Sequence, residues 1–151
     1  MEPQPRIFGT DGIRDRGGSG FLTDEDVERI VAATVATLQR ADDFRTDFPN
    51  ASKASGRGRI LIGRDTRASG ETLERTVAAA FARAGLDIDL LGVIPTPGVA
   101  HLAAKSAARL GVMISASHNP AEYNGLKFLA PTGAKMSDAF EDAVSDAYWA
   151  R

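Results

Sequence analysis

Residues 111–115 read Gly111-Val112-Met113-Ile114-Ser115, an apolar run that predicts a short buried strand. A second run of this kind is Arg59-Ile60-Leu61-Ile62-Gly63, and the residues Leu86-Asp87-Ile88-Asp89-Leu90 alternate as a strand does. Helical patterns lie between these segments. Strands that alternate with helices build right-handed βαβ units, so the sequence predicts a largely parallel sheet with helices on both faces.

The first and last helices are indicated by apolar residues at helical spacing. Thr23 is expected to cap the first helix, and the acidic residues 24–26 follow in the turn where the helix dipole favours negative charge. The buried stripe of this helix is expected to be Val27, Ile30, Val31, Val35 and Leu38. A final helix from Ser137 carries on one face Phe140, Val144, Ala147 and Tyr148.

Two more helices are expected between the predicted strands. Ser69 is expected to cap a helix that stops at Gly85, since glycine is favoured just past a helix end. The turn at residues 95–98 leads into an Ala-rich helix that reaches about Arg109.

The remaining segments are predicted to be loops. Residues 1–6 form a loose start, and residues 7–14 are dense in glycine and too irregular to assign. Residues 42–58 are polar and are expected to form a long, mobile surface loop. Residues 115–127 look loop-like, which leaves residues 127–129 available to pair with the sheet.

The length of 151 residues suits a single domain, 1–151, of class α/β with a mixed, largely parallel sheet sandwiched between helices. Lys and Arg are scattered and the net charge is −2, which argues against nucleic acid or a membrane as partner. Cysteine is absent, which excludes disulfides and thiolate metal sites. No signal-peptide pattern or membrane-length apolar run is present, so a cytoplasmic location is expected.

The loop after residues 111–115 is the first candidate for chemistry, because ligands of such sheets bind beyond the carboxyl ends of the strands. It carries Ser117, His118, Asn119 and Lys127. By residue type alone, turn formation would explain its Ser, Asn, Pro and Gly residues. A serine hydrolase fits poorly, since there is no G-x-S-x-G elbow and adjacent side chains rarely form a nucleophile–base pair. A phosphate site fits better, because a serine hydroxyl can carry a phosphoryl group whose charge Lys127 and backbone N–H groups would stabilise.

Two other segments also place polar residues after apolar ones. Residues 8–14 combine two glycines, a hydroxyl, an acid and Arg14, and Arg14 is interpreted as functional because a bidentate guanidinium suits phosphate. Residues 63–70 follow a predicted strand directly. There, a turn capped by Asp65 and arginines in weak surface ion pairs explain the pattern at least as well as a binding site.

Taken in order, these segments resemble the α-D-phosphohexomutase family from residue 7 to about residue 145. Together the motifs are far more specific than any one of them, and they outweigh the interpretation of Ser117 as a simple turn residue. The motifs are Phe8-Gly9-Thr10-Asp11-Gly12-Ile13-Arg14, Gly63-Arg64-Asp65-Thr66-Arg67, Ile94-Pro95-Thr96-Pro97-Gly98, and Ser115-Ala116-Ser117-His118-Asn119-Pro120 with Asn124-Gly125-x-Lys127-Phe128.

The resemblance implies a phosphoserine mechanism. Ser117 would donate its phosphoryl group to a sugar monophosphate, and the resulting bisphosphate would return its other phosphate to the serine. The family's Mg²⁺ bridges the serine phosphate and an aspartate-rich loop, D-G-D-x-D-R, in a second domain. This chain has no such loop, so Ser117 would contribute a metal ligand only through its phosphate.

The resemblance also implies roles for other residues of the motifs. His118 and Lys127 are candidates for proton transfer and charge stabilisation, and Arg14 for contact with the phosphoserine. The loop is expected to be oriented by Asn119, and phosphate binding is assigned to Asn119, Thr10 and Arg64.

Family enzymes are several times longer than this chain. We therefore expect it to be the phosphoserine-bearing amino-terminal domain of a longer multidomain mutase, inactive alone, with the remaining domains and a sugar phosphate as partners. Such a domain is expected to expose an apolar patch where other domains pack.

The residues of two motifs suggest which sugar phosphate is the substrate. F-G-T-D-G-I-R and S-A-S-H-N-P are most like the members that convert glucosamine 6-phosphate to glucosamine 1-phosphate for cell-wall precursors. Members acting on mannose or glucose phosphates are the alternative, and a non-catalytic binding module with this fold is another. One departure concerns the backbone after Arg14, where Asp15-Arg16 stand in place of the family's usual glycine.

Overall fold

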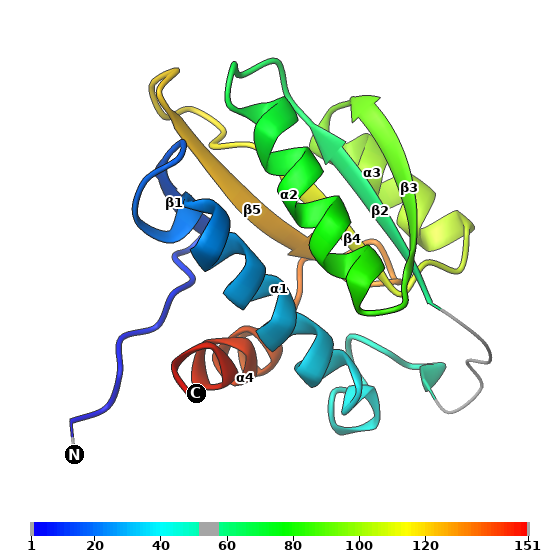
Figure 1. Cartoon of the computed structure of the whole chain (residues 1–151). Helices are drawn as coiled ribbons and strands as arrows, with labels where there is room; N and C mark the ends of the chain where they lie inside the picture. Colours follow the sequence, from blue (N-terminus) through cyan, green and yellow to red (C-terminus); the bar gives the residue numbers. More distant parts are fainter. Residues whose placement is uncertain (1, 52–57, 151) are drawn as a thin grey trace.

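A five-stranded sheet in the order β1-β5-β4-β2-β3 forms the centre of the computed structural model, which describes residues 2–51 and 58–150. Helices α1, α2 and α4 lie on one face of the sheet and α3 on the other (Figure 1). The predicted α/β class is thus confirmed. The elements are β1 (Ile13–Arg16), α1 (Asp24–Leu38), β2 (Arg59–Arg64), α2 (Gly70–Arg83), β3 (Asp87–Val93), α3 (Thr96–Lys105), β4 (Leu110–Ile114), β5 (Tyr123–Leu129) and α4 (Asp138–Trp149), with 3₁₀ turns at Gly20–Leu22 and Ala41–Asp43.

The sheet is mixed but mostly parallel. β2 pairs in parallel with both β3 and β4, whereas β5 runs antiparallel to both β4 and β1. β1 therefore shares the direction of β2, β3 and β4, and β5 opposes them. Because Arg64 pairs with Ile114, the carboxyl ends of β2 and β4 lie level with each other.

β5 begins at Tyr123, whereas the sequence predicted a loop as far as Lys127. The turn-forming pair Asn124-Gly125 conceals the strand, because both residue types are usually found in turns. Asn124 is buried, and its Nδ2 donates a hydrogen bond to Ser69 Oγ over 2.9 Å. Ser69 occupies the N-cap position of α2, as predicted, but its side chain makes no capping hydrogen bond and accepts one from Asn124 instead.

Two predicted helix starts are confirmed, and each has a capping hydrogen bond accepted by the side chain of its capping residue. Thr23 Oγ1 accepts from the N–H of Asp26 over 3.1 Å, and Ser137 Oγ accepts from the N–H of Phe140 over 3.2 Å. Gly85 follows the end of α2 with a φ of +91°, as expected for a glycine past a helix end. α3 ends at Lys105, short of the predicted end, because the chain turns there into β4.

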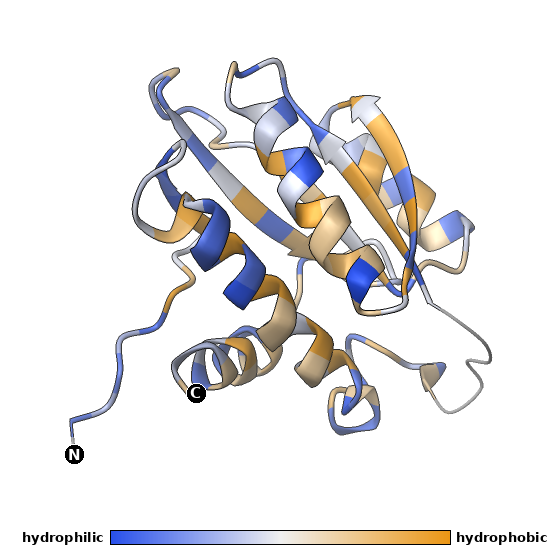
Figure 2. Ribbon diagram, viewed as in Figure 1, coloured by the Kyte–Doolittle hydropathy of each residue, from blue (hydrophilic) through white to orange (hydrophobic). Residues whose placement is uncertain are grey.

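The two faces of the sheet have separate cores. Alternate residues of β2 and β4 point to the side covered by α1, α2 and α4, among them Ile60, Ile62, Val112 and Ile114. On the other side Leu61 and Met113 contact α3 through Ala103 and Val99 respectively. The covering helices carry hydrophilic and hydrophobic residues on different sides, as Figure 2 shows for α1 and α2.

β3 is the edge strand beside β2, and it carries exposed apolar side chains. Leu90 and Val93 are each 57% exposed, and that they form part of the predicted surface for other domains stays a prediction. The register between β2 and β3 shifts after Ile62, and Gly92, with a φ of +73°, lies at this irregularity. β3 is therefore interrupted by an irregularity and is not a regular strand along its full length.

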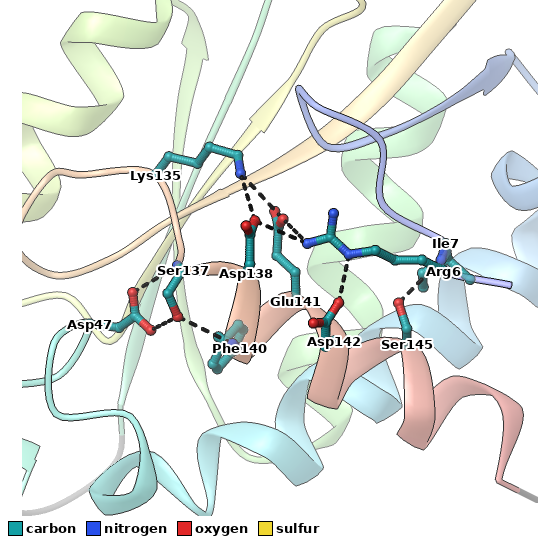
Figure 3. Close-up of polar contacts among 10 residues, drawn as sticks. All are labelled: Arg6, Ile7, Asp47, Lys135, Ser137, Asp138, Phe140, Glu141, Asp142 and Ser145. Atoms are coloured by element: carbon teal, nitrogen blue, oxygen red, sulfur yellow. Dashed lines mark hydrogen bonds and ion pairs between the residues drawn. The ribbon is translucent and has the colours of Figure 1, made fainter. Parts of the chain in front are cut away.

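The segment expected to be a mobile surface loop is anchored where the structure describes it. Phe44 and Phe48 place their rings 5.4 and 5.6 Å from the ring of Phe140 on α4. Asp47 is 4% exposed and accepts hydrogen bonds from the backbone N–H and the hydroxyl of Ser137 (Figure 3). Residues 42–51 are thus a largely exposed loop, as predicted, but one that is packed against α4 through Asp47, Phe44 and Phe48; residues 52–57 lie outside the described part of the chain.

The amino-terminal segment is held against α4 by charged and polar contacts. Arg6 pairs with three acidic residues of α4, which are Asp138, Glu141 and Asp142 (Figure 3). The N–H of Ile7 donates to Ser145 Oγ over 3.1 Å. Burial raises the pKa of Glu141, against the opposing charges of Lys135 and Arg6. These contacts fix the start of the glycine-rich residues 8–14.

Replacing Phe140 with alanine tests the anchoring of residues 42–51. Phe140 is fully buried beneath two rings, so Phe140→Ala should lower the free energy of unfolding by about 3–5 kcal/mol, measured by urea denaturation. The exposed Asp146 of the same helix supplies the control, and Asp146→Ala should change it by less than about 0.5 kcal/mol. Equal effects of the two changes would contradict this packing.

Candidate active site

The serine loop and the residues after β2 meet beyond the carboxyl ends of β2 and β4. The N–H of Asp65 donates to the carbonyl of Ile114 over 3.1 Å, and Ser115 Oγ donates to Asp65 Oδ2 over 2.6 Å. The Arg67 guanidinium donates to the carbonyl of Ser117 over 2.8 Å. Two motifs about 50 residues apart in sequence thus form one hydrogen-bonded structure.

Ser117 has a left-handed backbone and an exposed side chain. Its φ is +54°, a region that non-glycine residues seldom adopt and that costs roughly 1–2 kcal/mol. Its N–H donates to Ser115 Oγ over 3.0 Å, while the N–H of Asn119 donates to the carbonyl of Ala116 over 3.0 Å. Strain of this kind persists only where the surroundings over-determine it, and it is frequent at functional sites.

Arg14 and Lys127 lie on one face of the sheet next to this loop. Arg14 pairs with Gly125 across β1 and β5, and Lys127, two residues further along β5, pairs with Met113 of β4. Residues paired across strands, and residues two apart, share a face. Gly125 has no side chain on this face, and the position that its Cβ would take lies 3.0 Å from Arg14 Cγ, so the arginine passes close over the glycine.

The basic side chains near the serine loop have few partners in the described part of the chain. Arg14 makes one ion pair, 3.6 Å from Asp11, and its buried Nε lacks a hydrogen-bond acceptor. The side chains of His118 and Lys127 make no hydrogen bond or ion pair with any described residue. An anion at Ser117 would therefore meet positive charge that is not already neutralised.

The other predicted site residues divide between the loop and its surroundings. Asn119 lies within the serine loop, and Thr10 is exposed in the turn closed by the Gly9–Gly12 hydrogen bond. Arg64 instead points to α2, where its Nε lies 3.3 Å from a Glu74 carboxylate oxygen without the alignment of a hydrogen bond. Its role in phosphate binding stays a prediction.

Asp65 carries a carboxylate whose ionised form is stabilised. Burial raises its pKa, but hydrogen bonds from the Ser115 hydroxyl and from the N–H and guanidinium of Arg67 outweigh burial and hold the pKa below its usual value. The sequence suggested only a turn cap for Asp65, and the N–H of Arg67 does donate to its Oδ1 over 3.1 Å. The link to Ser115 could not be seen in the sequence.

The described residues contain neither a metal-binding cluster nor a membrane-spanning helix. No group of three or more His, Asp or Glu side chains there could hold a metal ion. No helix in the described ranges is long and apolar enough to cross a membrane.

Comparison with known proteins identifies the family. Residues 5–151 match the family model for phosphoglucomutase/phosphomannomutase, alpha/beta/alpha domain I. The chain belongs to the phosphoglucomutase/phosphomannomutase family. The resemblance inferred from the ordered motifs is therefore confirmed, as is the fold that it implied.

Several phosphoglucosamine mutases are close relatives of this phosphoglucomutase/phosphomannomutase domain. Those of Frankia casuarinae and Saccharopolyspora erythraea are 47% and 45% identical over 141 residues, which cover 92% and 93% of the chain. The chain spans about 29% of the length of these relatives.

Solved structures of the family have the same fold. A Thermus thermophilus protein assigned as a phosphomannomutase matches 96% of the chain and 30% of its own, with a TM-score of 0.76 and 28% identity. Parafusin, a phosphoglucomutase from Paramecium, matches 98% of the chain and 26% of its own, with a TM-score of 0.74 and 22% identity, which shows the fold alone.

Gly125 tests the close approach of β5 to its neighbours. A Cβ at this position would lie 2.7 Å from the carbonyl oxygens of both Ile13 and Ser115, so backbone would have to move. Gly125→Ala should lower the free energy of unfolding by about 1–3 kcal/mol, measured by chemical denaturation. Gly9→Ala is the control, because its Cβ would make an ordinary 3.6 Å contact. A tolerated Gly125→Ala would contradict the described backbone arrangement.

The lowered pKa of Asp65 predicts a pH-dependent contribution to stability. Its folded-state pKa lies below the ordinary 3.8, so the stabilisation is full above that value and is lost as the pH falls through the folded pKa. The difference in unfolding free energy between the unmodified chain and Asp65→Asn should therefore shrink as the pH is lowered from neutrality to about 2. Asp146→Asn, at an exposed carboxylate, is the control. A difference that does not change with pH would refute this assignment.

Proposed function

We propose that this chain is the phosphoserine-bearing domain of a mutase that interconverts hexosamine 6-phosphate and hexosamine 1-phosphate. The observation that carries the proposal is the exposed, left-handed Ser117 in a loop beside basic side chains that have few partners among the described residues. A phosphoserine brings about −1.5 to −2 charges and needs such cations around it. The resemblance of the ordered motifs and the phosphoglucosamine mutase relatives support the same reaction.

The reaction proceeds in two balanced phosphoryl transfers. In the first, a hydroxyl of the sugar monophosphate attacks the phosphorus on Ser117, the bond to Ser117 Oγ breaks, and a sugar bisphosphate and a free serine result. After the bisphosphate reorients, Ser117 Oγ attacks its other phosphate and releases the isomeric monophosphate. The phosphoserine is thereby regenerated, and no phosphate is consumed.

The chain's own residues position the groups and balance charge in both transfers. Lys127 and Arg14 stabilise the charge on the transferring oxygens, which is most of what phosphoryl transfer requires of a protein. His118 takes the proton of the attacking hydroxyl and returns one to the leaving oxygen. Asn119 orients the loop, while Thr10 and Arg64 bind phosphate, for which Arg64 exchanges its contacts with α2 for contacts with the ligand.

Mg²⁺ is part of the proposed enzyme, but the described residues of this chain do not by themselves fit a magnesium site. They contain no cluster of carboxylates, and Asp65 beside the loop is already engaged by Arg67 and Ser115. Oxygen ligands are what Mg²⁺ prefers. We infer that this chain contributes only the phosphate oxygens on Ser117, and that a later part of the longer enzyme contributes the carboxylates.

In this proposal, residues 1–151 form one domain of a longer cytoplasmic enzyme that supplies cell-wall precursors. Glucosamine phosphates are favoured as substrates by the relatives named phosphoglucosamine mutase. Mannose or glucose phosphates are the second candidate, which the solved structures named phosphomannomutase and phosphoglucomutase support.

Intact-mass spectrometry of the full-length parent protein tests the proposal. After incubation with glucosamine 1,6-bisphosphate and Mg²⁺, the protein should gain one phosphate-sized increment, and the Ser117→Ala variant should gain none. Ser106→Ala, at the exposed end of α3, is the control and should gain the increment. Absence of the increment from the unmodified full-length protein would refute the phosphoserine mechanism and favour a non-catalytic binding module.

A further inference from the structure

The backbone of Ser117 is held at both of its polar groups by side chains. Its N–H donates to Ser115 Oγ over 3.0 Å, and its carbonyl accepts from Arg67 Nη2 over 2.8 Å. The hydroxyl of Ser117 takes part in neither bond. The left-handed conformation is therefore fixed from outside the residue, and its side chain remains free to react.

Arg67 is committed to backbone and to Asp65 rather than to a ligand. Its Nε donates to Asp65 Oδ2 over 3.0 Å, and its Nη1 donates to the carbonyls of Pro120 and Tyr123 over 2.7 and 3.1 Å. With the bond to Ser117, four of the five N–H groups of the guanidinium are in use. The side chain is only 11% exposed. Little of it is left to bind a phosphate.

Asp65 joins the two contacts to Ser117. Its Oδ2 accepts from both Arg67 Nε and the Ser115 hydroxyl. The single O–H of Ser115 donates a hydrogen bond to Asp65. The lone pairs of the Ser115 oxygen are therefore available to accept a hydrogen bond from the N–H of Ser117. Asp65, Arg67 and Ser115 thus form a clamp on the backbone of Ser117.

We propose that Asp65 and Arg67 are positioning residues that keep Ser117 in its left-handed conformation throughout the phosphoryl-transfer cycle. The catalytic part of this inference rests on the proposed function, whereas the clamp itself does not. Because both clamp contacts to Ser117 are to its backbone N–H and carbonyl, the clamp holds the serine equally well with a free hydroxyl and with a phosphate. Positioning of this quality governs the rate of phosphoryl transfer.

A comparison of glycine and alanine at position 117 tests the clamp without any catalytic assay. At a left-handed position glycine is favoured over alanine, so Ser117→Gly should melt about 2–4 °C higher than Ser117→Ala in the 151-residue chain. In an Arg67→Ala background the residue can relax, and this difference should shrink by at least about half. An unchanged difference would refute the clamp.

Two further variants make this test specific. Arg83→Ala removes an exposed ion pair of α2 with Glu28 and should leave the glycine–alanine difference intact. Arg67→Lys keeps the charge but cannot reproduce the four hydrogen bonds, so it should behave as Arg67→Ala does. Full restoration by lysine would overturn the inference that bonding geometry holds the loop.

Kinetics of the full-length protein test the positioning role. With glucosamine 1,6-bisphosphate as phosphoryl donor, Arg67→Lys and Asp65→Asn should lower kcat of mutase turnover by about tenfold or more and leave KM for the donor within about twofold. A raised KM with unchanged kcat would show instead that Arg67 binds the donor's phosphate, and would overturn the inference. If the unmodified protein takes up no phosphate while the melting differences behave as expected, the proposed function fails and the clamp stands.

Discussion

The parallel pairing of β2 with β4 is the constraint on which the rest of the structure depends. Since Arg64 and Ile114 are partners in the ladder, the segments that follow the two strands leave the sheet side by side. The N–H of Asp65 can then reach the carbonyl of Ile114, and the Asp65 carboxylate can reach Ser115. The buried side chains of both strands, packed under α1, α2 and α4, resist any slip of this register.

Four basic residues of the domain differ in how many acceptors surround their side chains. Arg6 and Arg67 are surrounded by acceptors from this chain and hold parts of the fold together. Arg14 and Lys127 have few or no such acceptors among the described residues and lie on the face of the sheet next to Ser117. An unpaired charge is costly where it is shielded from water, so this second pair is where we propose that an anion binds.

The elements with a strong local pattern could be predicted from the sequence. β2 and β4 are short apolar runs, and Thr23 and Ser137 cap helices through a local hydrogen bond. β5 was missed because Asn124 and Gly125 are turn residues that tertiary contacts place in a strand. The anchoring of residues 42–51 depends on Phe140, about 90 residues away in sequence. The role of Arg67 in fixing the serine loop was missed because it binds backbone carbonyls of that loop. Every residue has a backbone carbonyl, so residue types do not reveal such a contact.

The irregular β3 has a consequence for how this domain behaves in a crowded cell. An exposed apolar edge strand is a template on which further strands can add, and long flat edges of this kind seed fibrils. Here the shift in register at Gly92 interrupts the row of free N–H and C=O groups between Leu90 and Val93. The edge can therefore keep its apolar side chains for contact with other parts of a protein while offering a poor start for cross-β growth.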